Sequence, residues 1–303
     1  MLELPCPAKI NLFLEVRGRR ADGFHDIGTL FQAMEAGDTL RAEPWNSLAL
    51  AGAEGVTENP DDNLVLKAAR LLRDRHADRF RSLDPARAGI RFTLEKRVPA
   101  GAGLGGGSSD AAAALRLANA IWKLGLDDAA LRALGAELGS DVPFFLSTPS
   151  TATAFGEGRG EILTPAPAPL SFHVVIATPR CHVDTGWAYR ELAERARSRE
   201  GRFGNAWPAF KARYAANPSD PSLYRDLHND FEEPVMGRYS EIRDVRDALR
   251  AHDPVAAKLS GSGASVFALF ADEAAAESAK TTVAPHCRWA VRTHFLDSLP
   301  VLT

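Results

Sequence analysis

The sequence predicts a mixed α+β protein made of two domains. Its 303 residues exceed the usual size of one domain, and segments with alternating apolar residues are interspersed with segments of helical periodicity. The stretch Pro165–Pro169 alternates proline with alanine, which is typical of a stiff extended connector. We therefore expect a first domain over 1–164 and a second over 165–303. A proline-rich loop inside a single domain is the alternative.

The first half of the chain is expected to begin with two extended segments and to continue with helices. Asn63 is a suitable cap for the first helix, and Ser108 and Ser109 are suitable caps for the second. The expected elements, in order, are strands over 10–16 and up to 31, helix 64–75, strand 90–96, helix 108–123, helix 128–138, and short strands at 151–155 and 161–163.

The second half alternates strands and helices around one polar stretch, 198–222. This stretch is rich in Arg, Gly, Asn, Pro and Ser, and we interpret it as a surface insertion. The other expected elements are strand 172–177, helix 185–197, a helix near 235–250, strand 265–270, helix 272–283 and strand 288–296.

Composition excludes several classes of protein. A net charge of −3 and a pI near 6.3 are unlike those of a general nucleic-acid binder. The three cysteines are far apart and lack CxxC spacing, which favours a reducing compartment over disulfides or a zinc site. The chain shows no signal-peptide pattern and no apolar run long enough to span a bilayer. We expect a cytoplasmic protein with a small-molecule partner, and no nucleic-acid or membrane partner.

The most informative segment is a glycine-rich loop at 101–107, where five of seven residues are glycine. Glycine accepts positive φ and has no Cβ, so successive N–H groups can turn toward one anion. The helix expected after the loop begins with further N–H groups that point the same way. The loop therefore predicts a phosphate site built from main-chain atoms.

Two familiar phosphate motifs do not fit this loop. Gly101, Gly103 and Gly106 satisfy GxGxxG, but a dinucleotide-binding unit requires a strand after the helix, and here a second helix follows. A P-loop requires a Gly-Lys pair, and no lysine in this chain follows a glycine. A second glycine cluster, at 260–264, is either an ordinary tight turn or a second wall of the same site.

Lys9 and Asp141 are the charged residues that we single out for chemistry. Lys9 is flanked by apolar residues at the mouth of a strand, and Asp141 precedes Val-Pro-Phe-Phe. A solvated surface lysine and a helix-capping aspartate are the ordinary alternatives. The sharper hypothesis is a pair that binds a hydroxyl and eases loss of its proton, because phosphoryl transfer requires little else from a protein.

Several motifs together resemble the GHMP kinases. The stretch Pro99 to Ser109 is similar to the central motif of that family. The narrower motifs are 7–14, 19–25, 29–32, 138–143 and 260–264. They resemble the branch that phosphorylates a cytidine diphosphate-linked polyol, methylerythritol, in isoprenoid precursor biosynthesis. The resemblance implies a two-domain fold: an N-terminal nucleotide domain like domain 2 of ribosomal protein S5, and a C-terminal ferredoxin-like α/β sandwich.

The resemblance also implies a site, with ATP and Mg²⁺ as cofactors. Asp141 would be the base, Lys9 would polarise the 2-hydroxyl or steady Asp141, and Ser108 could reach Mg²⁺ or a phosphate oxygen. The nucleotide would contact Asn63, Lys96, Pro99, Gly101, Gly103, Leu104, Gly105, Gly106, Gly107, Ser108, Ser109 and Thr185. The substrate would contact Asn11, Phe24, His25, Tyr189, Gly261 and Gly263.

Phe24 stands where the family usually has tyrosine, which keeps a stacking face but removes a hydroxyl. Trp187 competes with Tyr189 for the second aromatic wall. A homoserine or mevalonate kinase of the same family and a catalytically silent nucleotide-binding protein remain as alternatives. The expected assembly is a monomer or a weak homodimer.

Overall fold

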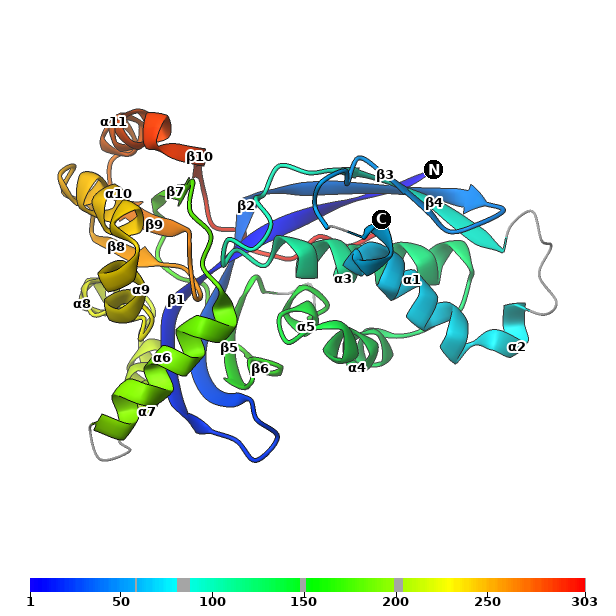
Figure 1. The fold of residues 1–303 in the computed structure, drawn as a ribbon, viewed down its shortest axis with the longest axis horizontal. Coiled ribbons are helices and arrows are strands. Elements are labelled where there is room, and N and C mark those ends of the chain that lie inside the picture. Colours follow the sequence, from blue (N-terminus) through cyan, green and yellow to red (C-terminus); the bar gives the residue numbers. More distant parts are fainter. Residues whose placement is uncertain (58, 81–87, 148–150, 199–203, 303) are drawn as a thin grey trace.

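The structure is a computed structural model that describes residues 1–57, 59–80, 88–147, 151–198 and 204–302. Its elements form two β-sheets, each with helices packed against it (Figure 1). This arrangement confirms the predicted α+β class with two sheets.

The first sheet contains six strands in the order β3-β4-β2-β5-β6, with β1 also paired to β2. Its long hairpin of β1 and β2 carries register shifts at Pro7/Lys9 and Asn11/Phe13, next to residues that the sequence singled out. The strands are β1 (Leu2–Arg19), β2 (His25–Trp45), β3 (Ala49–Ala51), β4 (Gly89–Glu95), β5 (Thr153–Gly158) and β6 (Ile162–Pro165).

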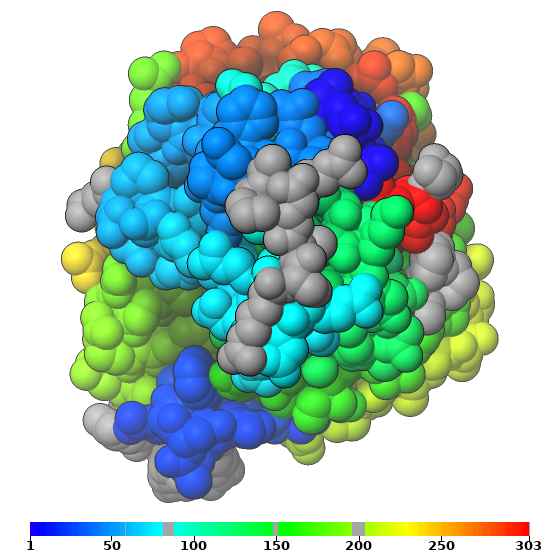
Figure 2. All heavy atoms as spheres, turned by 90° about the vertical axis from the view of Figure 1, so that its right-hand side faces the viewer, coloured from blue at the N-terminus to red at the C-terminus, as the bar shows by residue number. Residues whose placement is uncertain are grey.

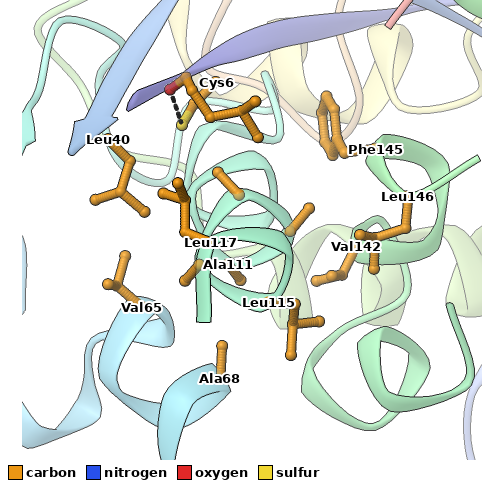
Figure 3. Close-up of a cluster of buried hydrophobic side chains, with 14 of the residues drawn as sticks. Cys6, Leu40, Val65, Ala68, Ala111, Leu115, Leu117, Val142, Phe145 and Leu146 are labelled. Atoms are coloured by element: carbon orange, nitrogen blue, oxygen red, sulfur yellow. Dashed lines mark hydrogen bonds between the residues drawn. The ribbon is translucent and has the colours of Figure 1, made fainter. Parts of the chain in front are cut away.

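Helices cover one face of the first sheet and enclose an apolar core. Figure 3 shows α3 side chains such as Ala111 and Leu115 between those of α1 and α5. The small alanines of α3 let it approach its neighbours closely, and all of Ala111–Leu115 is buried. The elements are η1 (Pro60–Asp62), α1 (Leu64–Arg75), α2 (Ala77–Phe80), α3 (Gly106–Ile121), α4 (Asp128–Leu138) and α5 (Val142–Phe145).

The second sheet has the strand order β10-β7-β9-β8, and all its pairs are antiparallel. Numbered by their order in the chain, these strands lie 4-1-3-2, and helices follow the first and third. That is the βαββαβ pattern of a ferredoxin-like sandwich, as predicted. The strands are β7 (His173–Pro179), β8 (Ala256–Leu259), β9 (Val266–Phe270) and β10 (Cys287–Thr293).

The second half differs from expectation at one helix and one strand. The helix predicted near 235–250 is two helices that meet at Tyr239, an extended residue at which the first helix ends. The short strand β8 has no counterpart among the predicted elements. The helices are α6 (Thr185–Ser198), α7 (Trp207–Ala216), α8 (Pro221–Arg225), α9 (Glu232–Arg238), α10 (Ser240–Arg250), α11 (Glu273–Val283) and η3 (Ala284–His286).

The polar stretch 198–222 is not a surface insertion over its described part. Residues 199–203 lie outside the described residues, but α7 and α8 bury Trp207, Tyr214 and Tyr224 completely or nearly so. The buried carboxylate of Glu15 accepts hydrogen bonds from the backbone N–H of Ala206 and of Trp207, at 2.7 and 3.0 Å. The aromatic residues therefore join α7 to the core between the two sheets.

The C-terminal residues return to the first sheet. After β10, Glu35 N donates to His294 O, and Leu296 N donates to Ala33 O. Leu299 is buried in the core of the first sheet. β6, the last strand of the first sheet, ends at Pro165 and β7 begins at His173, so the chain passes from one sheet to the other over 166–172. The division at 164/165 stays a prediction.

Candidate active site

The buried ammonium of Lys9 is held by three oxygen atoms. Its Nζ lies 2.8 Å from Asn11 Oδ1, 3.1 Å from Gly103 O and 3.4 Å from Asp141 Oδ2. The Lys9 residue is 3% exposed, whereas the Asp141 side chain is 29% exposed. A buried ammonium needs such partners. The pair therefore presents one carboxylate to solvent beside a fixed positive charge.

Asn11 is held in place by hydrogen bonds behind it, and the Asp141 side chain does not cap α5. Asn11 Nδ2 donates to Thr29 Oγ1 at 2.8 Å, and Thr29 Oγ1 donates to Phe13 O at 2.7 Å. These bonds fix the amide so that its oxygen faces Lys9. Asp141 occupies the N-cap position of α5 but makes no side-chain capping bond. The capping alternative for Asp141 is thus not what the structure shows.

The glycine-rich loop has the backbone that its sequence predicts. Gly101, Gly103 and Gly105 have φ of 63°, 79° and 67°, a region that favours glycine. A Cβ on Gly103 would lie 2.2 Å from Ser260 O, and one on Gly105 would lie 2.9 Å from Lys9 Cγ. Glycine is required at both positions because the second glycine cluster and Lys9 approach so closely.

The predicted capping of the helix after the loop is wrong. The N-cap of α3 is Gly105, and the helix begins at Gly106, so Ser108 and Ser109 lie inside its first turn. Gly105 has no side chain to occupy the first N–H groups of α3. The first N–H groups of α3 therefore face the loop with no side-chain acceptor from the cap residue. Together with the positive end of the helix dipole, they favour an anion at this position.

The second glycine cluster forms a wall of the same site. Ser260 Oγ donates to Gly103 O at 3.0 Å, and Ser265 N donates to Ala102 O at 3.1 Å. Asn229 Nδ2 donates to the carbonyl oxygens of Leu259 and Gly261. The two clusters are thereby locked together across the boundary between the two sheets.

A cavity of about 350 Å³ opens between these walls. It is lined by the reactive pair, by both glycine clusters and by the start of α3. The predicted site residues on its lining are Lys9, Asn11, Pro99, Gly101, Gly103, Gly105, Gly106, Gly107, Ser108, Asp141, Thr185, Tyr189 and Gly261.

A second cavity of about 790 Å³ adjoins the first and contains the predicted aromatic residues. It lies between the loop 19–25, the end of α4 and α6. Figure 2 shows the corresponding recess beside the projecting blue loop. Phe24, His25 and Tyr189 all line it. The rings of His25 and Tyr189 stack with centroids 4.8 Å apart, and Phe24 is 54% exposed.

His25 is prepared to recognise a polar group. Burial and the nearby charge of Arg19 lower the pKa of His25, so the ring is neutral at pH 7. Its Nε2 is buried and has no hydrogen-bond partner among the described residues. A neutral imidazole can donate or accept at this atom, and a buried polar atom without a partner is costly. The ring therefore favours a ligand with a complementary polar edge.

Comparison with known proteins agrees with this geometry. Residues 63–148 match the model of the GHMP kinases N terminal domain, and residues 215–287 match that of the GHMP kinases C terminal. The chain is 39% identical to a 4-diphosphocytidyl-2-C-methyl-D-erythritol kinase of Chlorobium phaeobacteroides, over 90% of each sequence. It is 38% identical to the one of Salinibacter ruber, over 97% of each. The chain belongs to the GHMP kinase family.

Solved structures of GHMP kinases place the chain in the same branch. The crystal structure of a 4-(cytidine 5'-diphospho)-2C-methyl-D-erythritol kinase is 33% identical to it, with a TM-score of 0.76 over 97% of this chain and 98% of that one. The mevalonate kinase of L. major is 13% identical with a TM-score of 0.69, which shows the shared fold alone. The mevalonate and homoserine alternatives are therefore not favoured.

Several residues predicted from the GHMP kinase resemblance lie off both cavities. Asn63 caps α1 by accepting from Val65 N at 3.0 Å. Leu104 is buried, and its carbonyl accepts from Lys9 N at 2.8 Å. Ser109 is buried, and Gly263 is not on either lining. Roles for these residues in ligand binding remain predictions.

Lys96 lies beneath the loop of this GHMP kinase rather than on its surface. Its Nζ bridges Asp38 Oδ2 at 2.6 Å and Asp110 Oδ2 at 2.7 Å. A Cβ on Gly106 would lie 3.1 Å from the same Nζ. Burial raises the pKa of Asp110 to about 7, helped by the second carboxylate, while the two carboxylates raise the pKa of Lys96. One ammonium is thus shared by two buried carboxylates.

The structure also separates the two candidates for the aromatic wall and adds one residue that was not predicted. Tyr189 lines both cavities, whereas the Trp187 ring packs against Tyr239 and under the guanidinium of Arg238. Arg159 lines both cavities as well. A lone arginine in the turn between β5 and β6 gives no sequence signal, because only folding brings this turn next to the two cavities.

Two features are absent from the described residues. None of their helices is both long enough and apolar enough to cross a membrane. No group of three or more His, Cys, Asp or Glu side chains among them is arranged to hold a metal ion.

Proposed function

We propose that this GHMP kinase transfers the γ-phosphoryl group of ATP to the 2-hydroxyl of 4-diphosphocytidyl-2-C-methyl-D-erythritol. The observation that carries the proposal is that two cavities lie next to each other and share part of their lining. One holds the Lys9–Asp141 pair beside a glycine cradle, and the other holds an aromatic pocket with an unpartnered His25 atom. The curated relatives named for this reaction, at 38–39% identity, support the choice of substrate.

Asp141 and Lys9 supply the chemistry in this proposal. Asp141 Oδ2 accepts the proton of the substrate hydroxyl as the oxygen attacks the γ-phosphorus. The bond between the γ-phosphorus and the bridging oxygen breaks, and ADP leaves with that oxygen. Lys9, 3.4 Å from that carboxylate, stabilises the negative charge that develops on the attacking oxygen. Asn11 fixes the position of Lys9 and lines the cavity where the hydroxyl would lie.

The loop fits a nucleotide phosphate chain. Its open N–H groups and the first turn of α3 would bind the phosphates, with Pro99 and Thr185 on the surrounding wall. Mg²⁺ prefers phosphate oxygens, water and one or two protein oxygens to a dedicated cage, and the Ser108 hydroxyl on the lining fits that preference. When bound, Mg²⁺ would neutralise charge on the transferred group.

The second cavity fits the cytosine end of the substrate. Phe24 and Tyr189 offer ring faces for stacking a base, and the neutral His25 offers Nε2 to the polar edge of that base. Base stacking on aromatic side chains contributes about 1–3 kcal/mol. The substitution of phenylalanine for the more usual tyrosine at position 24 keeps this contribution.

Release of ADP tests the proposal directly. Purified protein with ATP and Mg²⁺ should form ADP in the presence of the cytidine diphosphate-linked polyol, and phosphorus NMR should show a new phosphate ester at its 2-position. Homoserine and mevalonate serve as matched acceptors and should give no more ADP than a blank. The proposal fails if the cytidine compound gives none at micromolar enzyme.

We also keep three predictions about the molecule as a whole. The chain is proposed to divide into domains at 164/165, to act in a reducing cytoplasm, and to be a monomer or a weak homodimer. The three free cysteines are compatible with a reducing compartment. Light scattering across a concentration series tests the third, and a stable larger assembly would contradict it.

A further inference from the structure

Four residues line both cavities: Ser140, Arg159, Thr185 and Tyr189. Arg159 is the charged member of this set, so it places a cation at the passage between the reactive pair and the aromatic pocket. A ligand that occupies both cavities at once must cross this passage.

The position of Arg159 is built by a tight turn. β5 ends at Gly158 and β6 begins at Ile162, and Gly158 and Gly160 have φ of 69° and 111°. Glu161 Oε2 accepts from the backbone N–H of Arg159 at 2.6 Å, which fixes the tip of the turn. The turn thus presents the Arg159 side chain while the backbone N–H of this residue is bonded to Glu161.

The guanidinium of Arg159 is held in place by two weak contacts with described residues. It lies 4.8 Å from the centroid of the Phe24 ring, a cation–π contact. Its ion pair with Glu161 is long, with Nε 3.6 Å from Oε1, and its side chain is 30% exposed. Such a pair contributes little in water, so most of the five N–H donors remain available for an anion.

We propose that Arg159 binds the diphosphate of the substrate and thereby selects an acceptor whose base and hydroxyl are joined by an anionic linker. This inference rests on the proposed function. With the base against Phe24 and the hydroxyl at Asp141, the linker lies at the passage that Arg159 lines. Arginine suits this role because its planar donors match phosphate oxygens two at a time. Its contact with Phe24 couples the diphosphate subsite to the base subsite.

A split between KM and kcat tests the assignment. Arg159→Gln should raise the KM for the cytidine diphosphate-linked polyol at least tenfold, with kcat within threefold and the KM for ATP within twofold of wild type. Arg159→Lys keeps the charge but loses the planar pair of donors. Its KM for the cytidine diphosphate-linked polyol should lie between that of wild type and that of Arg159→Gln. Arg213→Gln removes a guanidinium from α7 that lines neither cavity and serves as the matched control.

Competing ligands distinguish phosphate binding from mere support of Phe24. Inhibition by cytidine 5'-diphosphate should weaken at least tenfold in Arg159→Gln, while inhibition by cytidine should change less than twofold. Equal weakening of both would assign Arg159 to bracing the ring and overturn the inference, as would a KM within twofold of wild type. If wild-type protein does not phosphorylate the substrate, the proposed function itself fails, and this result is distinct from either.

Discussion

At the scale of single residues, the site depends on side chains that are held from several directions at once. Lys9 lies next to a register shift in β1, where the hairpin departs from regular pairing, and its ammonium reaches a carbonyl of the glycine loop. Asp141 precedes α5, an element far from β1 in the sequence, and lines the same cavity. The pair exists only because the loop and both elements are correctly placed.

Asp141→Asn should lower kcat by about 10²–10⁴-fold, because the amide cannot accept the hydroxyl proton. The melting temperature should change little, since Asp141 makes no capping bond and is partly exposed. Steady-state kinetics and thermal unfolding give the two readouts. Asp244→Asn, an exposed carboxylate in α10, is the control and should match wild type in both. A kcat near wild type in Asp141→Asn would remove Asp141 from the base role.

Asn63 allows two roles to be separated. Asn63→Ala should lower the free energy of unfolding by about 1 kcal/mol, because the N-cap bond to Val65 is lost. Asn63→Asp keeps the acceptor and should keep the stability. Asn63→Asp also loses the amide donor. If Asn63 contacts the nucleotide, as the family resemblance implies, this variant should raise the KM for ATP. Denaturant unfolding and ATP kinetics measure these outcomes, and an unchanged KM in both variants would leave Asn63 with the capping role alone.

At the scale of elements, composition predicted α7 least well, because it indicated a surface insertion where the structure has a packed helix. Polar residues dominate the stretch around it, yet its few aromatic residues fill the space between the sheets. Glu157 ties the helix further, accepting from Trp207 Nε1 at 3.0 Å and from Lys211 Nζ at 2.9 Å. The Trp207 ring also covers Gly28 of β2 so closely that a Cβ there would lie 2.2 Å from its Cγ.

Gly28→Ala should therefore destabilise the protein by about 1–3 kcal/mol, the usual cost of overpacking a filled core. Gly18→Ala in β1 is the matched control, because a Cβ at that position meets no atom within 4 Å. Denaturant unfolding measures both free energies. Tryptophan fluorescence should shift in the first variant only. Equal stability of the two variants would show that α7 moves away at no cost.

The same elements show what sequence could and could not predict. The helix over 64–75 was predicted within its observed bounds, because apolar periodicity and the Asn63 cap are local signals. The start of α3 was misplaced because serine is a better cap than glycine, yet Gly105 can adopt the left-handed conformation that the loop requires. Arg159 and the burial of Trp207 depend on contacts between distant segments, and no local pattern records them.

At the scale of the whole molecule, buried charge makes stability depend on pH. Asp110 has its pKa raised from 3.8 to about 7 by burial and by Asp38 nearby. Between pH 3.8 and about pH 7, Asp110 keeps its proton in the folded state but has released it in the unfolded state. The contribution of Asp110 to the free energy of unfolding therefore falls as pH rises through this window.

Asp110→Asn should remove that dependence. The difference in unfolding free energy between the variant and wild type should move in the variant's favour as pH rises from about 4 to about 7. Loss of the contact with Lys96 adds an offset that does not vary over this range, because the pKa of Lys96 is raised above its ordinary value of 10.5. Urea unfolding at several pH values measures the difference. A constant difference would contradict the raised pKa of Asp110.

The return of residues 294–299 to the first sheet has a consequence for how the protein is made. Residues 33–35 of β2 pair with residues 294–296, which are synthesised long after them. At about 5–20 residues per second, that partner arrives on the order of tens of seconds later. During translation the N–H of Glu35 and the carbonyl of Ala33 therefore stay without these partners until residues 294–296 have been made.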